Sequence, residues 1–172
     1  MSEQPGNDAR IPLAGQGQQM ALVASAALAA SGATTASSIV SVLGARKITL
    51  FVKYTGGAAG GYPHILPLVS GALTSPATTD DSWYALGSWD GSITADTDLA
   101  ALPTNVDISP QNMGEIKMQE LLIRLAGTAS TDAQRIAITL DVTPFRWLFL
   151  VYAEKGVTAT PGTLAIDYTL SC

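Results

Sequence analysis

The chain has little of the chemistry that most enzyme active sites use. Among its 172 residues there is a single cysteine, Cys172, and a single histidine, His64. One cysteine cannot form a disulfide within the chain, and the two counts leave a zinc site of His and Cys ligands incomplete. A serine-histidine-aspartate triad would have to use His64, which has no acid or cysteine near it in the sequence. We therefore expect a protein that is not an enzyme, with no catalytic residues, no metal and no cofactor.

Charged residues are also scarce. They make up 13% of the chain, about half of the usual quarter, whereas hydrophobic residues make up 47%. The apolar content excludes a disordered chain, and the shortage of charge predicts a surface that is partly buried against neighbouring subunits. Lys and Arg number 9 against 14 Asp and Glu, for a net charge of −5. This balance argues against nucleic-acid binding, which needs a basic face.

The sequence gives no sign of a membrane segment. The small apolar stretch 20–33 has 14 residues, whereas a membrane-spanning helix needs about 20. The stretch also lacks the basic region that precedes the apolar core of a signal peptide. We therefore expect no membrane contact and no export.

Two loop segments look like ligand-binding sequences but lack residues that those sites need. Residues 56–61 are glycine-rich, but neither a Lys nor a helix follows them, as a phosphate-binding loop requires. Residues 90–98 carry closely spaced carboxylates, but Gly91 comes too early for a calcium loop of the EF-hand type. We interpret the first as a hairpin loop and the second as a solvated acidic loop. Between residues 54 and 116 there is no Lys or Arg, and there are seven acids: Asp80, Asp81, Asp90, Asp96, Asp98, Asp107 and Glu115.

Regular alternation of apolar and polar residues predicts β-strands. Residues 145–152 are apolar at both parities, so we expect a strand that is covered on both faces. Residues 62–69 are a further candidate, which Pro63 and Pro67 direct to a sheet edge. Three segments alternate clearly and have these apolar residues on one face: Ile48, Leu50, Val52 and Tyr54; Ile136, Ile138, Leu140 and Val142; Leu164, Ile166, Tyr168 and Leu170.

Strands at this hairpin-like spacing predict an all-β fold, an antiparallel β-sandwich of jelly-roll type over residues 39–172. Residues 70–115 form a long acidic loop region in it, with short strands expected near 82–88 and 105–108. Residues 1–38 are predicted to form an extended N-terminal arm. Its polar first part is extended, and its small apolar second part is either a short helix or a packed extended segment.

Two C-terminal runs, 145–156 and 160–167, resemble segments of the small β-sandwich virion proteins of tailed bacteriophages. Residues 47–54, with the Gly-rich turn after them, are similar to the early hairpin of these proteins. The resemblance implies a non-enzymatic structural role, most simply that of a capsid decoration (cement) protein. A tail, fibre-base or head–tail component is the alternative. It also implies the major capsid protein or other virion subunits as partners, a homo-oligomer such as a trimer, and a location in the virion after assembly in the host cytoplasm.

Partner contacts are predicted in the arm and at aromatic residues of the acidic loop region. Ordering a chain segment costs about 1–2 kcal/mol per residue in backbone entropy, so an ordered arm has to be buried against a neighbour. Exposed aromatic rings also stack on sugars. Trp83, Tyr84 and Trp89 therefore keep open a second hypothesis, a carbohydrate-binding sandwich for host recognition. The residues predicted to contact a partner are Leu13, Met20, Leu22, Val23, Leu28, Trp83 and Trp89.

Overall fold

A computed structural model of the protein describes residues 17–29, 34–57, 62–86, 112–113, 116–117, 134–155 and 160–172. In these ranges every helix or strand is a β-strand, which confirms the prediction of an all-β fold. The short strand expected near 82–88 is present as β6, whereas the one expected near 105–108 lies outside the described residues. The strands are β1 (Met20–Ala27), β2 (Thr35–Ala36), β3 (Val40–Ser41), β4 (Lys47–Thr55), β5 (Tyr62–Ser70), β6 (Tyr84–Ala85), β7 (Asn112–Met113), β8 (Ile116–Lys117), β9 (Gln134–Asp141), β10 (Trp147–Lys155) and β11 (Thr163–Ser171).

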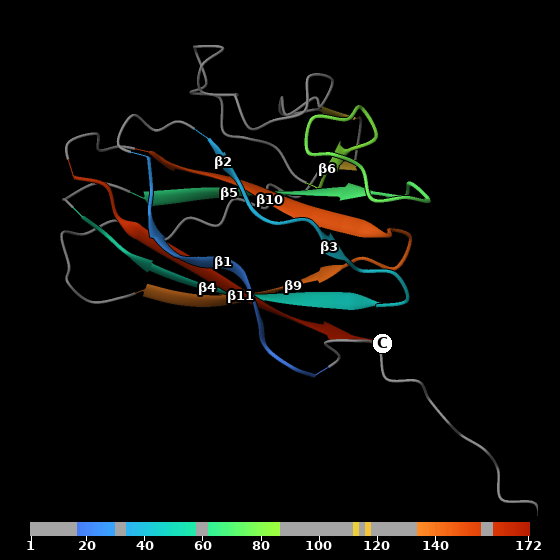
Figure 1. Ribbon diagram of the computed structural model, residues 1–172, viewed down its shortest axis with the longest axis horizontal. Coiled ribbons are helices and arrows are strands. Elements are labelled where there is room, and N and C mark those ends of the chain that lie inside the picture. The colour runs from blue at the N-terminus through green and yellow to red at the C-terminus, as the bar shows by residue number, and fades with distance from the viewer. Residues whose placement is uncertain are drawn as a thin grey trace, which may run out of the picture.

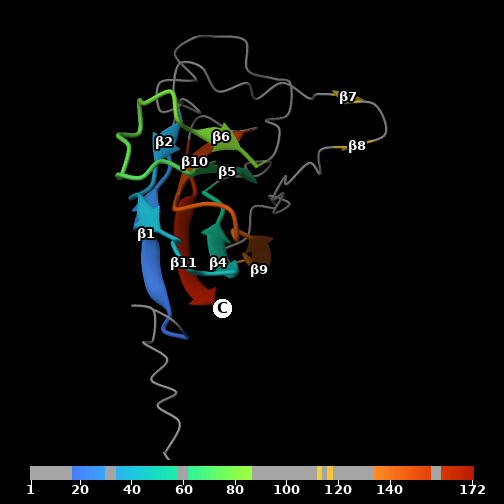
Figure 2. The ribbon, with the colours of Figure 1, turned by 90° about the vertical axis from the view of Figure 1, so that its right-hand side faces the viewer.

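Two antiparallel sheets account for nine of these strands and lie face to face (Figure 1). The four-stranded sheet has the order β1-β11-β4-β9. The five-stranded sheet has the order β2-β10-β5-β6, and β3 also pairs with β10. Figure 2 shows the two sheets as separate layers. Among the described residues, strands β7 and β8 pair with each other and with no further strand.

The core between the sheets follows from the alternation in the sequence. Leu50 of β4 and Ile166 of β11 are fully buried, and they share one apolar cluster with Ile65 of β5 and Leu150 of β10. Each sheet therefore contributes its inward-facing residues to a common interior, as in other packed sheets. Burial of each such side chain contributes about 1.5–3 kcal/mol.

Strand β9 follows its predicted pattern only at one end. Leu140 and the following Val142 are buried, but Ile138 is half-buried and Ile136 is exposed. In the described part of the chain β9 pairs only with β4, so it forms one edge of the four-stranded sheet. An edge position leaves the inward face of a strand less well covered than a central position does.

Strand β10 is buried on both faces, as its sequence predicts. Leu148 and Leu150 point into the core between the sheets. Phe149 and Val151 point the other way, into a second apolar cluster that includes Trp83. The ring of Trp83 meets Phe149 edge to face, with 4.5 Å between the ring centroids. The outer face of the five-stranded sheet is therefore closed at β10.

The two prolines of β5 lie at positions whose backbone nitrogens face away from β10, so they do not interrupt the hydrogen bonds between β5 and β10. Strand β5 pairs with β10 along its whole length, whereas β6 pairs with it only at Leu68 and Val69. The carbonyl of Pro67 accepts a hydrogen bond from the N–H of Leu86 at 3.0 Å, so this side of residue 67 faces away from β10. Alternation along the strand places residue 63 on the same side, where a missing N–H costs no bond to β10. The strand is thus next to the edge of its sheet, and β6 covers part of it.

The second part of the predicted arm is extended and packed, one of the two alternatives that the sequence left open, and it packs on this chain's own sheet. Residues 20–27 form β1, an extended edge strand that pairs with β11, with register shifts between Ala21 and Val23 and between Val23 and Ala26. Leu22 and the following Leu28 are buried in the core. The physical reason is that β1 satisfies the outer N–H and C=O groups of β11, which would otherwise lack partners. This segment is therefore part of the four-stranded sheet.

Two turns, 42–46 and 142–146, close one end of the molecule and are built alike. Each begins with Val and ends with Arg, and in each the N–H of the fourth residue donates to the carbonyl of the first at 3.0 Å. The first residue of each turn also donates its N–H to the carbonyl of the last residue of the other turn, at 2.9 and 3.0 Å. This reciprocal pairing ties the β3–β4 connection to the β9–β10 connection across a hundred residues of sequence.

A buried carboxylate joins the two sheets at the other end. Glu154 of β10 is 1% exposed, and its Oε1 accepts a hydrogen bond from the hydroxyl of Tyr54 in β4 at 2.6 Å. Its Oε2 accepts from the N–H of Gly162, just before β11, at 2.7 Å. Position 162 has no room for a side chain, because an added Cβ would lie 2.7 Å from the carbonyl oxygen of Thr55. We call these three residues the Glu154 clamp.

Removing the Tyr54 hydroxyl should weaken the fold measurably. Tyr54→Phe keeps the ring but leaves a buried carboxylate with one partner fewer, a change that costs about 1–3 kcal/mol. Urea unfolding should therefore give a lower free energy of unfolding than for the unmodified protein. Tyr152→Phe is the matched control, since the Tyr152 hydroxyl makes no hydrogen bond to any described residue. Equal stabilities for the two variants would contradict the clamp.

The clamp also predicts how stability responds to alkaline pH. Burial, the hydrogen bond with Glu154 and the charge of Glu154 all raise the pKa of Tyr54 far above its ordinary value of 10.0. The unfolded chain therefore loses this proton first, so the contribution of Tyr54 to stability is complete below pH 10 and declines as the pH rises above it. Between about pH 9 and 11, the free energy of unfolding should fall less steeply for Tyr54→Phe than for the unmodified protein. The same slope in both proteins would show that Tyr54 ionises freely in the folded state.

Candidate functional site

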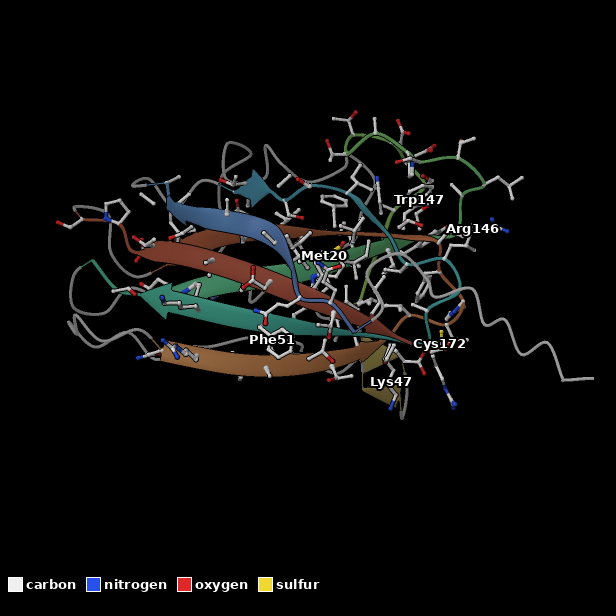
Figure 3. All side chains as sticks on the ribbon, turned by 60° about the horizontal axis from the view of Figure 1, so that its bottom comes forward. Met20, Lys47, Phe51, Arg146, Trp147 and Cys172 are labelled. Carbon is white, nitrogen blue, oxygen red and sulfur yellow. The ribbon has the colours of Figure 1, made fainter. Side chains whose placement is uncertain are left out.

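The outer face of the four-stranded sheet is open, unlike that of the five-stranded sheet. Residues of odd number on β4 point outward, and Phe51 is the large apolar side chain among them, 36% exposed. The sheet register places Asp167 of β11 on one side of Phe51 and Ala137 of β9 on the other. Figure 3 shows the Phe51 ring on this outer face, directed away from the five-stranded sheet.

A hollow of about 390 Å³ lies around the Phe51 ring. The small side chain of Ala137 leaves space on the β9 side, where a larger residue would fill it. We call this feature the Phe51 hollow, and its lining combines an aromatic ring, two cations, a carboxylate and an amide: Gln19, Phe51, Val52, Lys53, Arg135, Ile136, Ala137 and Asp167.

The carboxylate in the hollow is held in place by an amide. Gln19 Nε2 donates to Asp167 Oδ2 at 2.8 Å. One row further along the sheet, the hydroxyls of Thr49 and Thr139 are 2.9 Å apart and share a hydrogen bond. These contacts fix the polar groups on two sides of Phe51 before any ligand arrives.

The two cations of the hollow face each other. Lys53 of β4 and Arg135 of β9 occupy directly opposite positions in the register. Like charges directly opposite in a sheet destabilise the pair. Neither cation forms an ion pair within the described ranges, and Asp167, the carboxylate of the hollow, accepts from Gln19 through one of its two oxygens. The hollow therefore offers a positive spot that suits an anionic group.

At the end of this face next to the turns 42–46 and 142–146, the charges are arranged differently from those of the Phe51 hollow. Asp141 accepts hydrogen bonds from the hydroxyl of Thr143 at 2.6 Å and from its N–H at 2.9 Å. These two bonds lower the pKa of the Asp141 carboxyl, and the charges of Arg46 and Lys47 lower it further. Here Lys47 lies directly opposite a carboxylate, Asp141, whereas Lys53 lies directly opposite another cation, Arg135.

Within the described ranges there is no group of three or more His, Cys, Asp or Glu side chains that could hold a metal ion. His64 lies fully buried in β5, away from the Phe51 hollow. No helix in the part of the chain that the structure describes is long and apolar enough to cross a membrane.

The predicted partner-contact residues that the structure describes pack within this chain. Leu22, Val23 and Leu28 are buried in the core, and Met20 packs against it, so this chain already covers their apolar area. Leu13 and Trp89 lie outside the described residues.

Trp83 is likewise used inside the chain. It is 2% exposed, and its indole N–H donates to the carbonyl of Ala77 at 2.8 Å. A ring in this position cannot stack on a sugar. The neighbouring Tyr84 is exposed. Of the three aromatic residues in the carbohydrate hypothesis, Trp83 is buried and Trp89 lies outside the described residues, so Tyr84 is the one shown to be accessible.

Phe51 is the residue that the sequence patterns did not single out. The signal is present in the sequence, because Phe51 has the outward parity of a strand whose other outward residues are polar: Lys47, Thr49, Lys53 and Thr55. A lone aromatic residue on a polar strand face predicts either a packing partner or a ligand. The identity of its cross-strand neighbours, however, depends on pairing with β9 and β11, which are about a hundred residues away.

Comparison with known protein families, curated proteins and solved structures found no match to this chain.

The carboxyl of Asp141 provides a test of the charge pattern on this face. Thr143→Val removes the side-chain hydrogen bond, which is the largest cause of the lowered pKa, and keeps the backbone bond. The pKa of Asp141, followed by NMR during an acid titration, should rise toward its ordinary value. Because the folded pKa lies below the unfolded one, the stabilising contribution of Asp141 is present at neutral pH and is lost as the pH falls through the folded pKa. Thr139→Val is the control, and an unchanged Asp141 pKa in Thr143→Val would contradict this geometry.

Proposed function

We propose that the chain is a non-enzymatic structural protein of a tailed-bacteriophage virion, most simply a capsid decoration protein that stabilises neighbouring capsid subunits. Its partners are then the major capsid protein or other virion subunits, and it joins them in the host cytoplasm during assembly. A homo-oligomer, such as a trimer at a junction of capsid subunits, fits this role. The observation that carries the proposal is the order of the strands.

The strand order supports a jelly-roll topology. If β2 and β3 count as one interrupted strand, the described residues of the two sheets form eight strands in the chain order β1, β2/β3, β4, β5, β6, β9, β10 and β11. The first pairs with the eighth, the second with the seventh, the third with the sixth and the fourth with the fifth. These are the pairs of one long antiparallel ribbon rolled into two sheets. Jelly rolls of this kind form many viral shells and lectins, and this step of the argument is an analogy of fold.

Two exposed leucines at the end of the molecule that carries the turns 42–46 and 142–146 offer contact area for such a partner. Leu43 and Leu73 are 52% and 82% exposed. Their loops are held side by side: the turn 42–46 is bonded to Arg146, and the indole N–H of Trp147 donates to the carbonyl of Ala72 at 3.0 Å. Both loops lie at the same end of the sheets (Figure 1). Two large exposed leucines on anchored loops favour burial against another subunit.

Quantitative mass spectrometry of density-purified virions tests the proposal. The chain should be present at a fixed ratio to the major capsid protein, and labelling by electron microscopy should place it on the shell. A location on the tail would favour the alternative structural role. Virions without the chain would contradict the proposal.

A pair of variants then tests the two exposed leucines. Replacing both leucines, Leu43→Ser and Leu73→Ser, should lower the number of copies per virion severalfold, because each loses apolar contact worth about 1.5–3 kcal/mol when fully buried. The control is Thr74→Ser, an exposed neighbour on the same loop. Occupancy unchanged by the leucine variants would show that the contact lies elsewhere.

A further inference from the structure

We propose that the Phe51 hollow is a binding site for a carboxylated sugar of the uronic-acid class. The apolar face of the pyranose ring stacks on Phe51, and the sugar carboxylate pairs with Lys53 and Arg135. The inference does not rest on the virion role, because the site is formed by a single copy of the chain.

The aromatic ring provides the platform. Phe51 lies between Asp167 and Ala137 on the outer face of the sheet, and 36% of its surface is exposed. A ring held on a strand presents a flat surface at little cost in side-chain entropy. The C–H groups on one face of a pyranose are apolar and match such a ring. The small neighbour Ala137 leaves space for a second part of the ligand beside the platform.

The two cations select an acid. Lys53 and Arg135 lie directly opposite each other at one end of the hollow and have no ion-pair partner among the described residues. A carboxylate bound between them relieves their mutual repulsion. The guanidinium group of Arg135 can bind both oxygens of a carboxylate in a planar pair of hydrogen bonds. A neutral sugar would use the ring and leave this charge unmatched.

The hydroxyl groups of the sugar find partners on the other side of Phe51. Gln19 occupies Oδ2 of Asp167, which leaves Oδ1 to accept a hydrogen bond from a sugar hydroxyl. The amide of Gln19 keeps that carboxylate in a fixed orientation. The volume of about 390 Å³ lies near the lower end of the range of about 300–1,000 Å³ for small-molecule sites. This size suits one or two sugar units.

Calorimetric titration of the full chain with tetragalacturonic acid tests the proposal. We expect saturable binding that weakens with added salt, since the carboxylate contacts are close to solvent. The methyl ester of the same tetrasaccharide has no charge and should bind about tenfold more weakly, which corresponds to about 1.4 kcal/mol. No saturable binding of the acid, or equal binding of acid and ester, would overturn the proposal.

Variants separate the platform from the charge. Phe51→Leu keeps an apolar side chain but loses the flat ring, and Arg135→Gln removes one cation; each should weaken binding about tenfold or more. Lys47→Gln is the matched control, because Lys47 is a cation on the same face of the same strand with Asp141 opposite it. Urea unfolding of each variant confirms that it is folded.

A poly-glutamate peptide distinguishes a sugar site from a general acidic surface. It should bind more weakly than the tetrasaccharide and should not respond to Phe51→Leu. If the peptide binds as tightly as the sugar, or if the sugar binds equally to Phe51→Leu, the face recognises charge alone and the proposal fails. Neither result affects the count of copies in virions, so the two proposals fail independently.

Discussion

The contact on which the rest of the structure depends is the bidentate binding of the Glu154 carboxylate. A buried carboxylate is costly unless its oxygens have partners, and here the partners come from β4 and from the residue before β11. This satisfies the charge only when both sheets and the turn into β11 are in place. The same contact holds β4 and β11 in the register that sets Phe51 beside Asp167. The Glu154 contact therefore stabilises both the packing of the two sheets and the strand register around Phe51.

The two sheets use their outer faces in opposite ways. The five-stranded sheet is closed at β10, where Trp83 packs on Phe149. The four-stranded sheet keeps its outer face open, with polar rows around Phe51. The two outer faces of the molecule are therefore not equivalent, because one is covered by the chain's own loop and the other is exposed. Under the proposed virion role, attachment through Leu43 and Leu73 leaves the face around Phe51 exposed to solvent.

Much of this fold could be predicted from the sequence, because period-two patterns depend only on neighbouring residues. The alternation in β4 and β11 and the doubly apolar β10 were predicted from such patterns, and the structure confirms them. The rest depends on pairing between distant segments. The small residues of β1 carry too weak a pattern to predict an edge strand, and the burial of Trp83 depends on how its loop folds over β10. The Phe51 hollow needs three strands in register, which no local pattern contains.

The central claim is that the packing of the two sheets and the Trp83 loop buries β10 on both faces and leaves the outer face of β4 exposed at Phe51. Hydroxyl-radical footprinting with mass spectrometry tests it most directly, because it compares Phe51 of β4 with Phe149 of β10, the same side chain in two central strands. Phe51 is 36% exposed and Phe149 is fully buried. The account predicts rapid oxidation of Phe51 and protection of Phe149 in the folded protein. Oxidation of Phe149 at a rate equal to that of Phe51 would contradict it.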